Sequence, residues 1–399
     1  MSVASSQQQV FLRLIQALRP HWHQDRALPA LIQRRLSRER SFGSRDRRLY
    51  RELIYTTLRY LPWIEPWLDR DPARAVKRAA WLAAETRDTR AYRVETCGDW
   101  PGLPSLAARA AFLEADAADL LPGWFRAQCP AAGTPRELEA LLARAPLWLR
   151  LQTADEAGVA REFADRGWRT QPAPALPSAW RVLDDADVTQ TAAYADGRIE
   201  VQDLGSQLVL ASTAIHAGDR WLDACAGAGG KTLQLSERVG PAGLVEAHDI
   251  RPAALDELLV RAERAGRDNI RITTQPAAGR YAGVLVDAPC SGSGTWRRSP
   301  HLKWTTTPAT VAEHARQQLA LLARFAPCVQ PGGHLVYATC SLCPDENEGV
   351  LAKFLADHPG FAPRPPVQAF GFEPGPAGLT LLPARHDTDG FFVATLRRR

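Results

Sequence analysis

The C-terminal half of the chain alternates short apolar runs with longer amphipathic segments, and this alternation limits the fold more than any other feature. The runs have the length of buried strands; they are Trp221–Ala224, Leu244–Ala247, Ile270–Thr273, Val284–Val286 and His334–Ala338. Strand–helix–strand repetition predicts a doubly wound, mostly parallel α/β sheet over residues 201–399. The last run, Phe391–Leu396, is expected as an edge strand, antiparallel to its neighbour.

The first half of the chain has a different texture. Apolar residues recur at helical spacing, as between Val10 and Leu18, which predicts an all-helical domain over residues 1–95. Gly and Pro cluster in Thr96–Pro104 and mark a boundary. Residues 105–200 mix short strands with a helix at Glu156–Arg166, so a small α+β domain is expected to link the two larger ones.

Charge is distributed unevenly along the chain. The formal net charge is only +5, but nine Arg and three acidic residues lie between Arg34 and Arg59. An Arg-dense helical segment is typical of nucleic-acid binding. A solvated helix face is an equally good interpretation of this run by itself.

Cysteine usage and the chain start indicate a cellular compartment. Seven Cys, an odd number, are scattered through the chain, which favours a reducing cytoplasm over a disulfide framework. The N-terminus lacks the basic-then-apolar profile of a signal peptide, and no apolar run approaches 18 residues. A cytoplasmic protein without a membrane partner is therefore expected.

The loop Asp223–Thr232 follows the first strand of the predicted sheet and opens a helix, where glycines and free N–H groups favour a bound ligand. Three interpretations compete. A P-loop requires a first Gly where Cys225 stands, and the spacing of Gly227, Gly229 and Gly230 does not fit a dinucleotide fingerprint. The third is a nucleoside-cofactor loop of S-adenosylmethionine type. It needs an acid after the second strand, where Asp249 stands, although a helix cap would also explain this Asp.

Two cysteines directly follow two other strands. Cys290 comes after Val284–Val286 with Asp287 between them, and Cys340 comes after His334–Ala338. Chemistry in parallel sheets gathers at the carboxyl ends of strands, which favours a reaction centre over buried packing thiols. The spacing of Cys340 and Cys343 also suggests a redox pair or half a zinc site. The sequence has no second pair and no His pair at ligand spacing, so no metal is expected.

Five stretches together resemble a known family. LDACAGAGGKT, VLVDAPCSGSGT, RRSPHLKW, YATCSLCPDENE and DGFFVATL are similar, in this order, to the motifs of the NOL1/NOP2/Sun RNA cytosine-C5 methyltransferases. The resemblance covers residues 201–399 and is greatest to the family's bacterial small-subunit (16S) ribosomal RNA enzymes, which carry a NusB-like helical RNA-binding domain. It implies a class I S-adenosylmethionine-dependent methyltransferase fold with a mostly parallel seven-stranded sheet.

The resemblance also implies roles for individual residues. Cys340 would attack carbon 6 of the cytosine, Cys290 would assist release of the enzyme after methyl transfer, and Asp287 would bind the cytosine edge. The residues implied in S-adenosylmethionine binding are Cys225, Ala226, Gly227, Ala228, Gly229, Gly230, Lys231, Asp249 and Asp287.

RNA contacts are expected just after the Cys290 loop. Basic and aromatic side chains there suit phosphates and an unpaired base, although a basic loop capping a helix is the alternative; they are Arg297, Arg298, Lys303 and Trp304. The sequence departs from the family at Ala278, where an acid would contact the adenine. Gln275 is the nearest polar substitute.

The resulting hypothesis is a monomeric RNA cytosine-C5 methyltransferase that acts on 16S ribosomal RNA. The same chemistry on tRNA or 23S ribosomal RNA is one alternative. From a different class comes an RNA-binding ribosome-assembly factor with weak or lost methylation, which the missing acid at Ala278 favours and the two cysteines oppose. An NTPase is the weakest reading of the loop.

Overall fold

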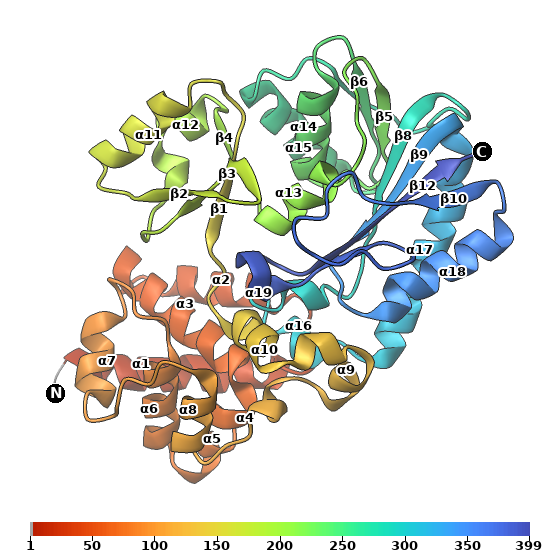
Figure 1. Cartoon of the computed structure of the whole chain (residues 1–399). Coiled ribbons are helices and arrows are strands. Elements are labelled where there is room, and N and C mark those ends of the chain that lie inside the picture. Colours follow the sequence, from red (N-terminus) through yellow and green to blue (C-terminus); the bar gives the residue numbers. More distant parts are fainter. Residues whose placement is uncertain (1–2) are drawn as a thin grey trace. The chain divides into compact units, whose positions relative to one another are not determined.

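The computed structural model describes residues 3–399 and divides the chain into two units (Figure 1). A helical unit contains the residues up to Arg144 together with Thr295–Thr307, and an α/β unit contains Ala145–Gly294 and Pro308–Arg399. This division differs from the predicted domains at 1–95, 105–200 and 201–399. Residues 105–144 belong to the helical unit, and residues 145–200 belong with the large sheet.

The helical unit is built around buried apolar side chains at helical spacing, such as Leu14, Ile15 and Leu18 of the first helix. Its helices are α1 (Val3–Leu18), α2 (Leu28–Arg38), α3 (Ser44–Arg59), α4 (Leu61–Ile64), α5 (Trp67–Arg70), α6 (Pro72–Leu82), α7 (Arg90–Cys97), α8 (Leu106–Phe112), α9 (Gly123–Gln128), α10 (Pro135–Leu142) and α16 (Leu302–Thr305). No helix within residues 3–399 is long and apolar enough to cross a membrane.

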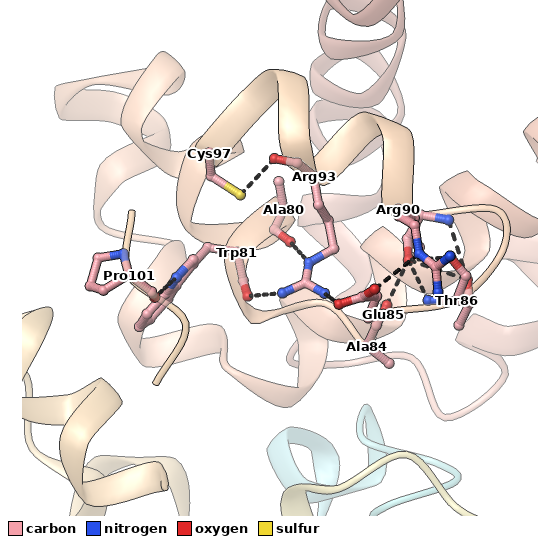
Figure 2. A network of polar contacts seen from close by, with 10 residues as sticks. Ala80, Trp81, Ala84, Glu85, Thr86, Arg90, Arg93, Cys97 and Pro101 are labelled. Atoms are coloured by element: carbon pink, nitrogen blue, oxygen red, sulfur yellow. Dashed lines mark hydrogen bonds and ion pairs between the residues drawn. The ribbon is translucent and has the colours of Figure 1, made fainter. Parts of the chain in front are cut away.

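The side chain of Arg93 connects α7 to the end of α6 (Figure 2). Its guanidinium donates to the carbonyl oxygens of Ala80 at 3.2 Å and Trp81 at 3.4 Å and pairs with Glu85. These carbonyls belong to the last turn of α6 and have no partner within the helix. The Cys97 thiol donates to the Arg93 carbonyl, one turn earlier in α7, at 3.0 Å.

The segment Thr295–Thr307 joins the helical unit although it follows the Cys290 loop in sequence. The Lys303 ammonium donates to the carbonyl of Arg59 at 2.8 Å, and the Trp304 indole donates to the carbonyl of Leu58 at 2.6 Å. Both carbonyls lie at the C-terminal end of α3, where helix carbonyls need outside donors. The segment therefore completes the end of that helix.

The α/β unit begins with a small antiparallel sheet in the order β2-β3-β1-β4. Its elements are β1 (Leu147–Leu151), α11 (Glu156–Asp165), β2 (Thr170–Ala173), β3 (Leu176–Val182), α12 (Ala192–Ala195) and β4 (Ile199–Val201). The indole of Trp148 donates to the carbonyl of Asp387 at 2.9 Å, which ties this sheet to the C-terminal part of the unit.

The large sheet has the order β10-β12-β9-β8-β5-β6-β7, with β11 paired to β12. Strands β5 to β9 are parallel to one another, as the sequence predicted. Its strands are β5 (Arg220–Asp223), β6 (Leu244–Ala247), β7 (Ile270–Ile272), β8 (Tyr281–Asp287), β9 (Val329–Thr339), β10 (Phe361–Arg364), β11 (Leu379–Leu381) and β12 (Phe391–Arg398). The helices of this part are α13 (Leu204–Ala211), α14 (Gly230–Val239), α15 (Pro252–Arg264), α17 (Pro308–Phe325), α18 (Glu348–Asp357) and α19 (Pro383–His386).

Both faces of the large sheet are covered by apolar cores. Trp221 of β5 packs in the core that includes Leu233 of α14, and the next residue, Leu222, packs in the core that includes Leu322 of α17. Helices α14 and α17 accordingly lie on opposite sides of the sheet (Figure 1). Burial on both faces explains why these strands are apolar throughout instead of alternating.

The last strand corrects one expectation. β12 is antiparallel to its neighbours, as predicted, but it lies inside the sheet between β9 and β10 instead of at an edge. Phe392 and Val393 are both buried because each faces a different core. The strand β10 that covers it is short and contains Pro363, so its sequence gave little sign of a strand.

Candidate active site

A pocket of about 930 Å³ opens at the carboxyl ends of β5, β6, β8 and β9. The loops after these four strands form most of its wall, and helix α17 closes one side. The lining residues from the strand ends and loops are Asp223–Ala228, Gly230, Lys231, His248–Arg251, Asp287–Cys290 and Cys340. This is the place where ligands bind in open α/β sheets.

The glycine-rich loop turns sharply at Gly229 and starts α14 at Gly230. Gly229 has φ +92°, a left-handed conformation, and a Cβ there would lie 2.7 Å from the side chain of Leu258. Only glycine fits this position without strain. Gly229 does not line the pocket, so its part is to shape the loop, whereas Gly227, Ala228 and Gly230 face the cavity.

Asp249, at the end of β6, is held as an ionised acceptor on the pocket wall. Its carboxylate accepts from the Gly227 amide at 2.8 Å and pairs with Arg251 at 3.0 Å. Burial by itself would raise the pKa of Asp249, but the bonds from Arg251 and Gly227 outweigh burial and lower it. A charged carboxylate at this strand end can accept hydrogen bonds from ligand hydroxyls.

A buried ion pair stands beside the cysteines. The Lys231 ammonium donates to the Asp287 carboxylate at 2.8 Å. Burial disfavours the ammonium, but Asp287 outweighs burial, and the pKa of Lys231 is raised. Beneath this pair, burial raises the pKa of Asp223 to about 7, opposed by the hydrogen bond from Thr232 and reinforced by the charge of Asp287.

The structure brings Cys290 and Cys340 together. Their sulfur atoms lie 3.2 Å apart, and both residues line the pocket. The pKa of the Cys290 thiol is raised well above its usual value, first by its hydrogen bond with Cys340, then by burial and nearby negative charge. In this arrangement Cys290 retains its proton and can donate a hydrogen bond to the Cys340 sulfur. A thiolate is the nucleophilic form of cysteine.

Other cysteines of the unit are unsuited to this chemistry. Burial, followed by the charges of Asp223 and Asp287, raises the pKa of Cys225, so it remains a thiol on the pocket wall. Cys343 is fully buried beside Ser293. Within residues 3–399, no group of three or more His, Cys, Asp or Glu side chains is arranged to hold a metal ion.

Gln275 and Ala278 do not line the pocket. The wall beyond Asp249 comes instead from Ile250 and from one face of α17, a contribution that the sequence interpretation missed; the residues of α17 are Gln317, Ala320, Leu321, Arg324 and Phe325. Their spacing of three and four residues on a helix that precedes a sheet strand is a usable signal. His248 also lines the pocket, 3.5 Å from the Arg324 guanidinium.

The four expected RNA contacts lie in the helical unit, and most of them are not available to RNA. Lys303 and Arg297 are only 2% and 1% exposed, and Arg297 donates to the carbonyl of Arg144 at 3.1 Å. Burial, reinforced by the charge of Arg59, lowers the pKa of Lys303 well below its usual value. The half-buried Trp304 caps α3, and only Arg298 is exposed. The helix-capping alternative therefore describes Lys303 and Trp304 correctly.

Known proteins resemble this chain in sequence and fold. The family model for 16S rRNA methyltransferase RsmB/F matches residues 210–397. The probable ribosomal RNA small subunit methyltransferase B of Synechocystis sp. is 36% identical over 259 residues, which cover 60% of this chain and 57% of that relative. The ribosomal RNA small subunit methyltransferase B of Salmonella arizonae is 33% identical over 303 residues, covering 72% of this chain and 68% of the relative.

A solved structure has a similar fold. It is the methyltransferase homolog protein from Pyrococcus horikoshii, which is 25% identical, with a TM-score of 0.59 over 69% of this chain and 93% of that one.

The raised pKa of Asp223 predicts a pH-dependent stability. Between the ordinary carboxyl pKa and about 7, the folded chain binds a proton at Asp223 that the unfolded chain releases. Stability from this group is therefore lost as pH rises through that window. Asp223→Asn should reduce the loss of unfolding free energy between pH 5 and pH 8, measured by urea denaturation. Glu257→Gln, on the exposed face of α15, is the control. Equal losses in wild type and Asp223→Asn would contradict the assignment.

Proposed function

The chain belongs to the RsmB/F family of 16S ribosomal RNA methyltransferases, and we propose from this premise that it methylates carbon 5 of a cytosine in small-subunit ribosomal RNA. The observation that carries the proposal is the contact between the Cys290 and Cys340 sulfur atoms, 3.2 Å apart, beside the Lys231–Asp287 pair. A chemistry that needs two thiols and a carboxylate at one point accounts for this arrangement.

The cofactor of this family is S-adenosylmethionine, which supplies the methyl group when bound. The pocket fits it: an acid stands at the end of β6, the loop before α14 exposes backbone to the cavity, and the far wall offers Ile250, Leu321 and Phe325 for apolar contact. Asp249 would bind the ribose hydroxyls. The methionine end would lie along Lys231 and Asp287 and the loop residues Cys225, Ala226, Gly227, Ala228 and Gly230, with Gly229 shaping the turn.

Carbon 5 of cytosine is a weak nucleophile, and Cys340 would activate it. Its thiolate forms a bond to carbon 6, and the electrons of the 5,6 double bond make carbon 5 nucleophilic. After carbon 5 has gained the methyl group, loss of its proton lets Cys340 leave and restores the double bond. Cys290, which is in contact with Cys340, would assist this release.

Asp287 would bind the edge of the cytosine base. Its side chain is 29% exposed, and one carboxylate oxygen accepts from Lys231. The other oxygen would be left for the cytosine amino group. Because Lys231 fixes the carboxylate before the base arrives, little reorganisation would be needed as charge develops.

Within the helical unit, the Arg-rich run between Arg34 and Arg59 offers an RNA surface in place of the segment after the Cys290 loop. Exposed arginines on α2, in the segment after it and at the start of α3 form no ion pairs with carboxylates among the described residues; they are Arg34, Arg35, Arg38, Arg40 and Arg45. Arg binds phosphates in a bidentate way. These side chains, with Arg298, would bind the RNA backbone, whereas Arg297, Lys303 and Trp304 would support the unit from inside.

Replacement of the proposed nucleophile tests the chemistry. Cys340→Ala should lower methyl transfer from labelled S-adenosylmethionine to 16S ribosomal RNA on the order of 10³-fold or more, because no other group adds to carbon 6. Cys328→Ala, which removes a buried thiol outside the pocket, should leave the rate unchanged. Retained activity in Cys340→Ala would refute the assignment.

Replacement of the second cysteine should have a different effect. Cys290→Ala should accumulate a covalent protein–RNA adduct on a denaturing gel, because release is impaired while attack by Cys340 continues. The double variant Cys290→Ala/Cys340→Ala is the matched control and should form none. An adduct that persists in the double variant would remove both roles. An adduct that requires Cys290 would reverse them.

The target is tested by bisulfite sequencing of RNA from a deletion strain. The proposal expects one cytosine of 16S ribosomal RNA to lose its methyl group. Loss in 23S ribosomal RNA or in tRNA would assign the same chemistry to another substrate. An unchanged pattern in all three would favour an assembly factor without methylation.

A further inference from the structure

A fully buried carboxylate, Glu346, lies between the two cysteine loops, and the mechanism above does not use it. Its side chain is 0% exposed. One oxygen accepts from the Ser291 amide at 2.8 Å and from the Gln318 amide at 3.1 Å. The other accepts from the hydroxyls of Ser291 at 2.5 Å and Ser341 at 2.6 Å. All four donors are uncharged, so the negative charge is solvated by hydrogen bonds alone.

The donors are placed directly beside the reacting groups. Ser291 follows Cys290 in sequence, and Ser341 follows Cys340. One carboxylate therefore holds both loops at the residues next to their sulfur atoms. The two hydroxyls are also 3.3 Å apart, so the contact between the loops is continuous.

The residue after Glu346 strengthens the same connection. The Asn347 side chain donates to the Ser341 carbonyl at 3.0 Å and accepts from the Thr339 hydroxyl at 2.7 Å. The chain is thus fixed on both sides of Cys340. A carboxylate and an amide with all these bonds satisfied form a rigid support, because loss of any one bond leaves a buried polar group without a partner.

Glu346 also acts through its charge. The pKa of Cys290 is raised mainly by its hydrogen bond with Cys340 and by burial, and the charges of Cys340 and then Glu346 raise it further. The Glu346 carboxylate accepts from the backbone amide of Ser291, the residue after Cys290, and a negative charge beside this loop disfavours a thiolate at Cys290.

We propose that Glu346 is a positioning residue for the cysteine pair: its buried carboxylate holds Ser291 and Ser341 so that the two sulfur atoms stay in contact, and it places a negative charge beside the Cys290 loop. The purpose of this arrangement rests on the proposed methyl transfer. The geometry of the arrangement and the experiments that test it concern the two thiols alone, so they do not depend on that proposal.

Glu346→Gln separates the two effects. The amide oxygen can take the place of the oxygen that accepts from Ser291 and Gln318, and the amide NH₂ can donate to the two serine hydroxyls, which rotate to accept. The four hydrogen bonds remain while the charge is lost. Glu346→Asp keeps the charge but withdraws the carboxylate by one methylene, and Glu346→Ala removes both.

The first measurement is the pH dependence of Cys290 alkylation by iodoacetamide, quantified by peptide mass spectrometry in the full chain without RNA. In Glu346→Gln the midpoint should move down by about one pH unit, because the thiolate is no longer opposed by the carboxylate. Glu348→Gln, two residues away and exposed, is the matched control and should behave as wild type. An unchanged midpoint in Glu346→Gln would overturn the charge role.

The second measurement is the rate at which diamide joins Cys290 to Cys340, with diamide taking up the two electrons and two protons that the thiols lose. Glu346→Gln should react within about twofold of the wild-type rate, because the sulfur atoms stay in contact. Glu346→Asp and Glu346→Ala should react about tenfold more slowly or worse. The aspartate variant keeps the test valid if the alanine variant fails to fold. Wild-type rates in a folded Glu346→Asp would overturn the positioning role.

The outcomes are independent of the proposed function. If Cys340→Ala still methylates RNA but the thiol rates change as described, the methyl-transfer mechanism fails and the positioning role stands. If Cys340→Ala is inactive but the thiol rates are unchanged in the Glu346 variants, the methyl-transfer mechanism stands and the positioning role fails.

Discussion

The parallel pairing of β8 with β9 is the constraint on which the candidate active site depends. In this register Asp287 lies opposite Ala338, so both strands end at the same level of the sheet. Three residues beyond Asp287 stands Cys290, and two beyond Ala338 stands Cys340. A shift of the register by one residue would also move every side chain of a strand to the other face, which two buried cores prevent. The apolar cores thus fix the distance between two polar loops.

Around these two strand ends, charged side chains are partly or wholly buried. The Lys231–Asp287 ion pair lies inside the pocket, and the Glu346 carboxylate is buried behind the cysteine loops. Such groups are costly to bury unless every bond is satisfied. The structure meets this cost with backbone amides and hydroxyls already in position. A site organised in this way would have little to rearrange during a reaction, which is where electrostatic preorganisation is effective.

Strand ends were readable from the sequence, and tertiary partners were not. The apolar runs before Asp287 and Cys340 stop abruptly, so their meeting at one sheet edge was predicted and the structure contains it. The burial of Arg297 and Lys303 was missed because a sequence shows a charge but not the helix-end carbonyls that receive it. The role of Glu346 was missed for the same reason, since its donors lie up to 55 residues away along the chain.

The central claim is that Cys340 forms the bond to carbon 6 of the cytosine. It is tested most directly with RNA in which 5-fluorocytosine replaces cytosine, because a fluorine at carbon 5 cannot leave as a proton and the adduct persists. Peptide mass spectrometry would then locate the attached nucleotide. The account predicts a nucleotide attached to Cys340 that persists when S-adenosylmethionine is supplied, because carbon 5 then carries fluorine and has no proton to lose. Attachment at Cys290, or no attachment to an enzyme that methylates ordinary RNA, would contradict it.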